Sequence, residues 1–81
     1  RDSKSRAQEW AQAHFGGTPS YRLLGTQGPD HEREFTVALE LHDAEVTTGT
    51  GRSKIDAEQD AARAALSAWM ADAPPGEADE D

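Results

Sequence analysis

A stretch of strict alternation, from Glu34 to Leu41, most constrains how this chain folds. Successive side chains of a β-strand point to opposite faces, so this pattern predicts a strand with one apolar and one polar face. The apolar face consists of Phe35, Val37, Leu39 and Leu41. The chain has 81 residues and no Cys, so disulfides cannot hold such a sheet and other elements must cover its apolar face.

Two further strands are predicted on either side of this one. Tyr21 to Thr26 is a short strand candidate, and Glu45 to Thr50 is rich in Thr and Val, which favour strands. A polar loop from Gln27 to Arg33 joins the first two strands, and His42-Asp43 is typical of a tight turn before the third. Such short connections predict an antiparallel sheet of three strands.

A helix is predicted ahead of the sheet, over residues 3–15. Its apolar side chains recur at the spacing of one helix face, and they are Ala7, Trp10, Ala11, His14 and Phe15. Asp2 or Ser3 is expected to cap its start, and Gly16-Gly17 is expected to end it. The segment therefore offers one apolar face for packing.

A second helix is predicted after the sheet, from Lys54 to Met70, with Ser53 as its N-cap. Small side chains along one face would let this helix approach the sheet closely; they are Ala57, Ala61, Ala64, Ala65 and Ala68. Leu66, Trp69 and Met70 add bulk near its end. The sequence thus predicts an α+β fold of order α-β-β-β-α, with both helices on the apolar face of the sheet.

The charge of the chain argues at first against a nucleic-acid partner. Eight Lys and Arg stand against sixteen Asp and Glu, which gives a net charge of −8. Five of the acids lie in the last ten residues, and without them residues 1–71 hold eleven acids and eight bases, a net charge of −3. We therefore expect a folded domain over residues 1–71 and an acidic disordered tail over residues 72–81. The tail is either a solubilising terminus or linker, or an intramolecular competitor for a basic surface.

The chain offers little for catalysis or metal binding. Its three His, at positions 14, 31 and 42, lack the spacings typical of metal sites. The neighbouring carboxylates of Glu58 and Asp60 are expected to be solvated surface groups. Neither a membrane-spanning apolar run nor a signal-peptide pattern is found in the sequence. Because the chain begins at Arg1 rather than Met, we expect it to be part of a longer protein.

Three groups of polar residues each have an ordinary interpretation and together fit one purpose. The first predicted helix carries a polar face comprising Ser5, Gln8, Glu9 and Gln12. Gln8 and Gln12 lie one turn apart, and glutamine both donates and accepts hydrogen bonds, which suits the 2′-hydroxyls and base edges of an RNA minor groove. By itself, such a face is typical of any solvated helix.

The other two groups are a loop and a helix start. The loop Pro29, Asp30 and His31 follows Gly28, and its exposed backbone carbonyls could meet 2′-hydroxyls, although an incidental hairpin loop has the same composition. Arg52, Ser53 and Lys54 place two cations at a helix N-terminus, where free N–H groups attract phosphates. The alternative for this group is a capped helix with solvated charges.

These residues occur in an order that resembles a double-stranded RNA-binding domain, from about residue 2 to residue 66. The resemblance rests on Pro19-Ser20-Tyr21, Gly28-Pro29-Asp30-His31, Phe35-Thr36-Val37, Gly49-Thr50-Gly51, Ser53-Lys54 and Ala57 with Ala61-Ala62. The opening Ser5-Arg6-Ala7-Gln8-Glu9-Trp10 and the runs Gly51-Arg52-Ser53-Lys54 and Ala57-Glu58-Gln59 are most similar to the C-terminal domain of bacterial ribonuclease III.

The resemblance implies the roles of the three groups. Ser5, Gln8, Glu9 and Gln12 would lie in one RNA minor groove, Pro29, Asp30 and His31 in the next, and Arg52, Ser53 and Lys54 on phosphates across the major groove between them. Recognition would follow A-form shape, which excludes DNA. No cofactor or metal is implied for this chain; a Mg²⁺-dependent catalytic domain elsewhere in the parent would cleave RNA, as in rRNA processing. The domain would be a cytoplasmic monomer, away from membranes, and the parent a homodimer through its catalytic domain.

One position departs from the family's pattern and motivates an alternative function. Ile55 stands where a second basic residue is usual, and Asp56, Glu58 and Asp60 follow it. We therefore expect fewer phosphate contacts and weak RNA binding by this domain alone. The alternative is a degenerate domain of the same fold that mediates protein–protein contacts.

Overall fold

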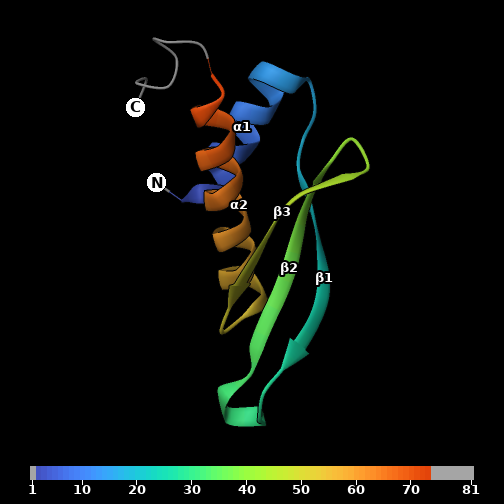
Figure 1. Ribbon diagram of the computed structural model, residues 1–81, viewed down its shortest axis with the longest axis vertical. Coiled ribbons are helices and arrows are strands. Elements are labelled where there is room, and N and C mark those ends of the chain that lie inside the picture. Colours follow the sequence, from blue (N-terminus) through green and yellow to red (C-terminus); the bar gives the residue numbers. More distant parts are fainter. Residues whose placement is uncertain (1, 74–81) are drawn as a thin grey trace.

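The computed structural model describes residues 2–73, and the predicted fold is confirmed. Its elements follow one another as α1 (Ser3–Phe15), β1 (Ser20–Gln27), the 3₁₀ turn η1 (Asp30–Glu32), β2 (Glu34–Leu41), β3 (Ala44–Gly51) and α2 (Lys54–Ala71). The three strands form one layer and the two helices lie together on one side of it (Figure 1). The acidic tail predicted over residues 72–81 lies almost wholly outside the described residues, so the boundary at residue 71 stays a prediction.

The sheet is an antiparallel meander in the order β1-β2-β3, as the alternating strand and its short connections predict. The turn between β2 and β3 places His42 and Asp43 at φ 53° and 64°, the left-handed geometry that matches the twist of a two-residue hairpin. The connection between β1 and β2 is the predicted polar loop, and it includes one short element that the sequence analysis did not predict. It contains η1, in which the N–H of Glu32 donates to the carbonyl of Pro29 at 2.9 Å.

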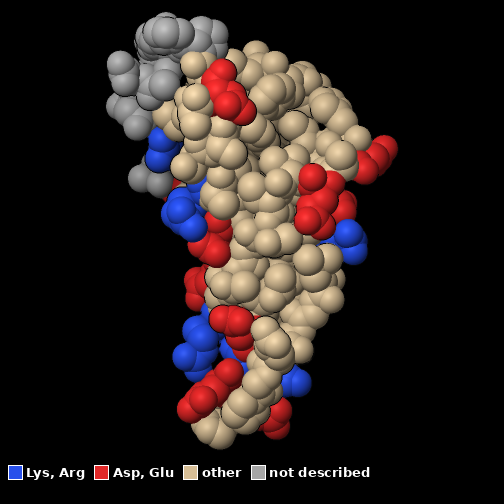
Figure 2. Space-filling view, viewed as in Figure 1, with Lys and Arg blue, Asp and Glu red and all other residues tan. Residues whose placement is uncertain are grey.

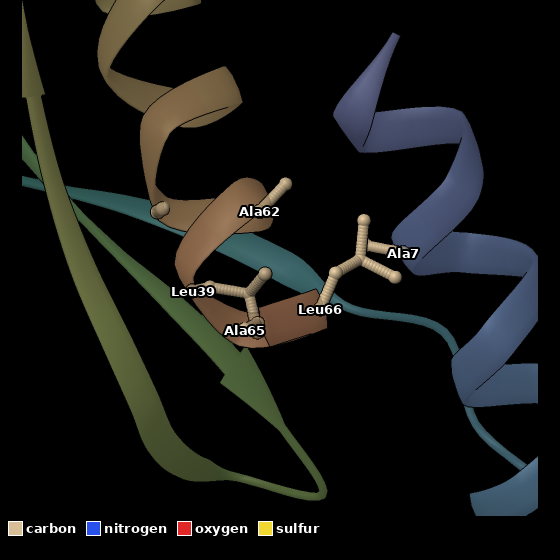
Figure 3. Packing of buried hydrophobic residues seen from close by; sticks show 6 residues of the cluster. Ala7, Leu39, Ala62, Ala65 and Leu66 are labelled. Atoms are coloured by element: carbon tan, nitrogen blue, oxygen red, sulfur yellow. The ribbon is translucent and has the colours of Figure 1, made fainter. Parts of the chain in front are cut away.

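The core lies between the sheet and the two helices. Its central cluster joins Ala7 of α1 and Leu39 of β2 to the α2 residues Ala61, Ala62, Ala65 and Leu66. Figure 3 shows Leu66 extending from α2 toward Ala7, while Leu39 reaches α2 near Ala65. α2 therefore packs on two sides at once, against β2 and β3 and against α1.

Two predicted apolar faces extend less far than expected. On α2, Ala62 is buried and Ala68 is exposed, because the helix packs on two neighbours rather than along one stripe. On α1, Ala7 and Ala11 are buried but His14 and Phe15 are exposed. The His14 ring instead stacks on Trp10, with 4.0 Å between ring centroids.

Glycines in β3 allow α2 to lie very close to the sheet. A Cβ added at Gly49 would lie 2.6 Å from the carbonyl oxygen of Ala57, and one at Gly51 would lie 2.7 Å from the backbone nitrogen of the same residue. The hydroxyl of Thr47 donates to the carbonyl of Ala61 at 2.8 Å across this contact. The Gly49-Thr50-Gly51 segment thus fixes where α2 begins relative to the sheet.

The predicted caps form at both helix starts. Asp2 Oδ1 accepts from the N–H of Ser5 at 2.7 Å, and Ser53 Oγ accepts from the N–H of Asp56 at 3.0 Å. The hydrogen bond from Ser5 also lowers the pKa of Asp2. Gly16, at φ 69°, ends α1 as predicted. Neither described helix combines the length and apolar character needed to cross a membrane.

Candidate nucleic-acid interface

The polar face predicted on α1 is exposed, but its two glutamines do not act as a pair. Ser5, Gln8, Glu9 and Gln12 all face solvent. The side-chain amide of Gln12 donates to the hydroxyl of Thr18 at 2.9 Å, so Gln12 turns toward the segment that follows α1. Gln8 instead lines an open hollow beside the start of α2. The two glutamines of this face therefore contact different parts of the molecule.

The hollow has a volume of about 360 Å³ and lies between the first turns of the two helices. Its lining residues are Asp2, Lys4, Ser5, Gln8, Pro19, Tyr21, Ile55 and Gln59. Ile55 is 58% exposed there. This exposure is expected, because Ile55 stands where the family usually has a basic residue. Of the three predicted RNA-binding groups, only the first contributes to this lining, through Ser5 and Gln8, and Ile55 follows the third group directly in the chain.

A partly buried ion pair lies beside this hollow and corrects one prediction. Glu58, expected to be a solvated carboxylate, is only 7% exposed and accepts from Lys4 Nζ at 2.5 Å. Lys4 Nζ also lies 5.1 Å from the centre of the Tyr21 ring. Burial, and then the charges of Glu58 and Asp2, raise the pKa of Tyr21 to about 12. The charge of Lys4 is thus compensated within the fold.

The loop between β1 and β2 has a defined shape. Gly28 adopts φ +94°, and a Cβ there would lie 2.7 Å from the carbonyl oxygen of Glu32. The carboxylate of Asp30 lies 3.9 Å from the guanidinium of Arg33. Pro29, Asp30 and His31 are all exposed, so the structure leaves them accessible as the prediction requires.

The third group, at the start of α2, lies close to this loop. Arg52 Nη2 donates to the backbone carbonyl of His31 at 3.2 Å. Ser53 caps the helix, and Lys54 is exposed at its first position. The structure therefore joins the second and third predicted groups directly, by a contact between residues 21 positions apart.

The basic side chains of the described residues differ in whether they pair with carboxylates. Four of them pair with carboxylates: Lys4 with Glu58, Arg22 with Glu40, Arg33 with Asp30 and Arg63 with Asp60. Within residues 2–73, Arg52 and Lys54 make no ion pair of this kind. Figure 2 shows acidic and basic side chains intermingled over one face, with basic ones beside the lower end of α2. Positive charge free to meet phosphates therefore lies at the start of α2.

Sequence reasoning missed the residues that connect the two helix starts. The side-chain oxygen of Gln59 accepts from the backbone N–H groups of Ser3 and Lys4, at 2.9 and 3.1 Å. These partners are more than fifty positions apart in the chain, and no local pattern signals such a contact. The described residues also contain no cluster of three or more His, Cys, Asp or Glu that could hold a metal ion.

Comparison with known proteins decides the family. Residues 3–68 match the sequence profile of the double-stranded RNA binding motif. The chain belongs to this family. The double-stranded RNA-binding domain is also the fold of a solved neighbour, the first such domain of protein HYL1. That structure is 32% identical with a TM-score of 0.67, over 86% of this chain and 99% of its own. The resemblance noted in the sequence is therefore confirmed.

Two similar curated proteins that contain such a region are both named Ribonuclease 3. Ribonuclease 3 of Nitratiruptor sp. is 53% identical over 66 residues, which cover 82% of this chain and 29% of that protein. Ribonuclease 3 of Wolinella succinogenes is 50% identical over 66 residues, covering 82% of this chain and 28% of that protein. The chain thus spans less than a third of the length of these relatives.

Proposed function

We propose that this domain binds double-stranded RNA by its A-form shape. The face of α1 enters one minor groove, the β1–β2 loop enters the next, and the start of α2 meets phosphates across the intervening major groove. The observation that carries the proposal is the placement of Arg52 and Lys54. Neither is paired with a carboxylate in the described part of the chain, and both lie where the N–H groups and dipole of α2 attract anions.

The local arrangement offsets the overall acidity. Phosphates respond to charges within about 10 Å at ordinary salt, so two unpaired cations at a helix start matter more than the net charge of the chain. Few such cations also mean few counterions released on binding. The affinity of the isolated domain is therefore expected to be low and to fall with salt.

Titration of a 20-base-pair RNA duplex, and of the DNA duplex of the same sequence, tests this function at about 50 and 200 mM salt. RNA binding that exceeds DNA binding and weakens at the higher salt is the expected result. Arg22→Gln serves as a control, because Arg22 pairs with Glu40 on the sheet face away from the helices and should leave the affinity unchanged. No RNA binding at the lower salt would refute the proposal.

The parent protein is proposed to be a ribonuclease III-like endoribonuclease of RNA processing, including rRNA. The support is the similarity to two proteins named Ribonuclease 3, which extends over 82% of this chain. In this proposal the domain holds the substrate while a separate Mg²⁺-dependent catalytic domain cleaves it and forms the homodimer. Two domains on one duplex would then raise the effective concentration of each, which suits a weak module in the cytoplasm.

Ile55 favours a second candidate, a protein–protein contact through the same hollow. Its side chain is 58% exposed beside Gln8, where a cation would serve RNA better. Ile55→Lys separates the two candidates. Stronger RNA binding by this variant supports RNA as the ligand, and unchanged or weaker RNA binding favours the protein partner.

A further inference from the structure

The exposed guanidinium of Arg52 makes a hydrogen bond within the protein. Its Nη2 donates to the backbone carbonyl of His31 at 3.2 Å, which connects the residue before the α2 cap to the middle of the β1–β2 loop. The side chain of His31 itself is 80% exposed and stays available. A contact of this kind fixes the position of the loop without using the group that the loop presents.

The loop between β1 and β2 holds its own shape through contacts within it. The turn from Pro29 to Glu32 is closed by a backbone hydrogen bond of 2.9 Å, and Gly28 supplies the left-handed residue at its base. Figure 1 shows the loop at one end of the molecule, beyond the ends of β1 and β2 and toward the start of α2. Its internal geometry is thus set locally and its base is held by the pairing of Gln27 with Glu34, while Arg52 connects its middle to the segment that leads into α2.

We propose that Arg52 is a positioning residue, which holds the β1–β2 loop at a fixed distance from the start of α2. The inference rests on the proposed function, in which these two elements meet a minor groove and the neighbouring phosphates of one duplex. A loop held in place before binding loses less conformational freedom on contact with RNA. It also favours duplexes whose groove spacing matches that fixed distance. Lys54, one helix position beyond the cap, supplies charge without such a link.

Two matched variants separate position from charge, since each removes one cation at the same helix start. Arg52→Met is expected to loosen residues 30–32, seen as lower heteronuclear NOE values and shifted amide signals in the RNA-free protein. Lys54→Met is expected to leave these signals unchanged. Circular dichroism confirms that both variants are folded.

Binding is then measured on two RNA duplexes, of 20 and about 8 base pairs. The domain spans about 16 base pairs, so only the longer duplex engages both minor-groove elements. Lys54→Met should weaken binding to the two duplexes by similar factors. Arg52→Met should weaken binding to the longer duplex by about three- to tenfold more than binding to the shorter one, which is the effect of one hydrogen bond.

The outcomes distinguish this inference from the proposed function. Equal losses for the two variants on both duplexes, with residues 30–32 unchanged in Arg52→Met, would overturn the positioning role and leave Arg52 as a phosphate contact. Failure of the unaltered domain to bind RNA would refute the function, while the loop signals of the free protein still test the link between Arg52 and His31.

Discussion

The starts of the two helices contain similar residues, but they differ in whether their N–H groups and their lysine have partners within the fold. At the start of α1, the side chain of Gln59 accepts from the first N–H groups, and Glu58 forms an ion pair with Lys4. At the start of α2, Ser53 accepts one N–H group and Lys54 has no ion-pair partner in the part of the chain that the structure describes. One helix start is closed by the fold and the other is left open to an anion.

The difference teaches that a count of cations says little about where RNA is bound. Lys4 and Lys54 both occupy the first turn of a helix, where sequence patterns do not separate them. Their partners differ because α2 carries Glu58 on the side facing α1, and no carboxylate pairs with Lys54 among the described residues. Compensation within the fold therefore selects which cations remain for phosphates.

Both helix starts depend on the close contact between α2 and β3, so breaking that contact has the largest expected effect. Gly49→Ala should lower the free energy of unfolding by about 3 kcal/mol, because the added Cβ would meet the backbone of α2. Urea unfolding measures this loss. Gly25→Ala is the matched control, since nothing lies within 4 Å of its Cβ position, and a comparable loss there would contradict the steric account.

Removing the carboxylate that closes the start of α1 should have the next largest effect. Glu58→Gln leaves the ammonium of Lys4 without its partner, and the expected loss in the free energy of unfolding is about 1–2 kcal/mol, reduced by the partial exposure of Lys4. Glu40→Gln removes the partner of the exposed Arg22 and should cost less than about 0.5 kcal/mol. Equal losses would mean that burial of the Lys4 pair is unimportant.

The cap at the open start of α2 contributes less. Ser53→Ala removes the acceptor of the Asp56 N–H and should lower the free energy of unfolding by about 1 kcal/mol. Ser67→Ala, at an exposed position within the same helix, is expected to be neutral or slightly stabilising. Thermal unfolding of the two variants compares a cap with an ordinary helix position, and equal midpoints would count against the cap.

Low pH should lower the stability of the fold by a smaller amount, through the carboxyl groups of Asp2 and Asp60. Hydrogen bonding from Ser5 lowers the pKa of Asp2 below 3.8, and a backbone hydrogen bond from Thr50 lowers that of Asp60. A carboxyl whose pKa is lower in the folded state stabilises the fold above its unfolded pKa, and this contribution is lost as pH falls through the folded pKa. Thermal midpoints below about pH 4 should therefore fall less steeply in Asp2→Asn than in the unaltered domain. Parallel curves would contradict this assignment.

Most of the fold follows from local signals in the sequence. The strand Glu34–Leu41, the turn at His42 and Asp43 and the cap at Ser53 are each encoded by neighbouring residues, and each is confirmed, although burial along the strand does not alternate strictly. The buried face of α2 was placed less well, because so many of its residues are Ala that several stripes have the same composition.

The interface was predictable only in part, because its geometry depends on contacts between distant segments. Exposure of the three polar groups follows from their placement on a helix face, a loop and a helix start. The Lys4–Glu58 pair, the bond from Arg52 to His31 and the turn of Gln12 toward Thr18 appear only when the elements are packed. Charge compensation is thus a tertiary property that composition does not report.

The most direct measurement is the salt dependence of RNA affinity after removal of each lysine. Lys54→Met should reduce the slope of log K against log salt concentration by about 0.9, the value for one phosphate contact. The double variant Lys4→Met, Glu58→Gln, which removes the closed pair without leaving a buried charge, should leave the slope unchanged. An unchanged slope in Lys54→Met, with a reduced slope in the double variant, would contradict the claim that compensation decides which cations meet RNA.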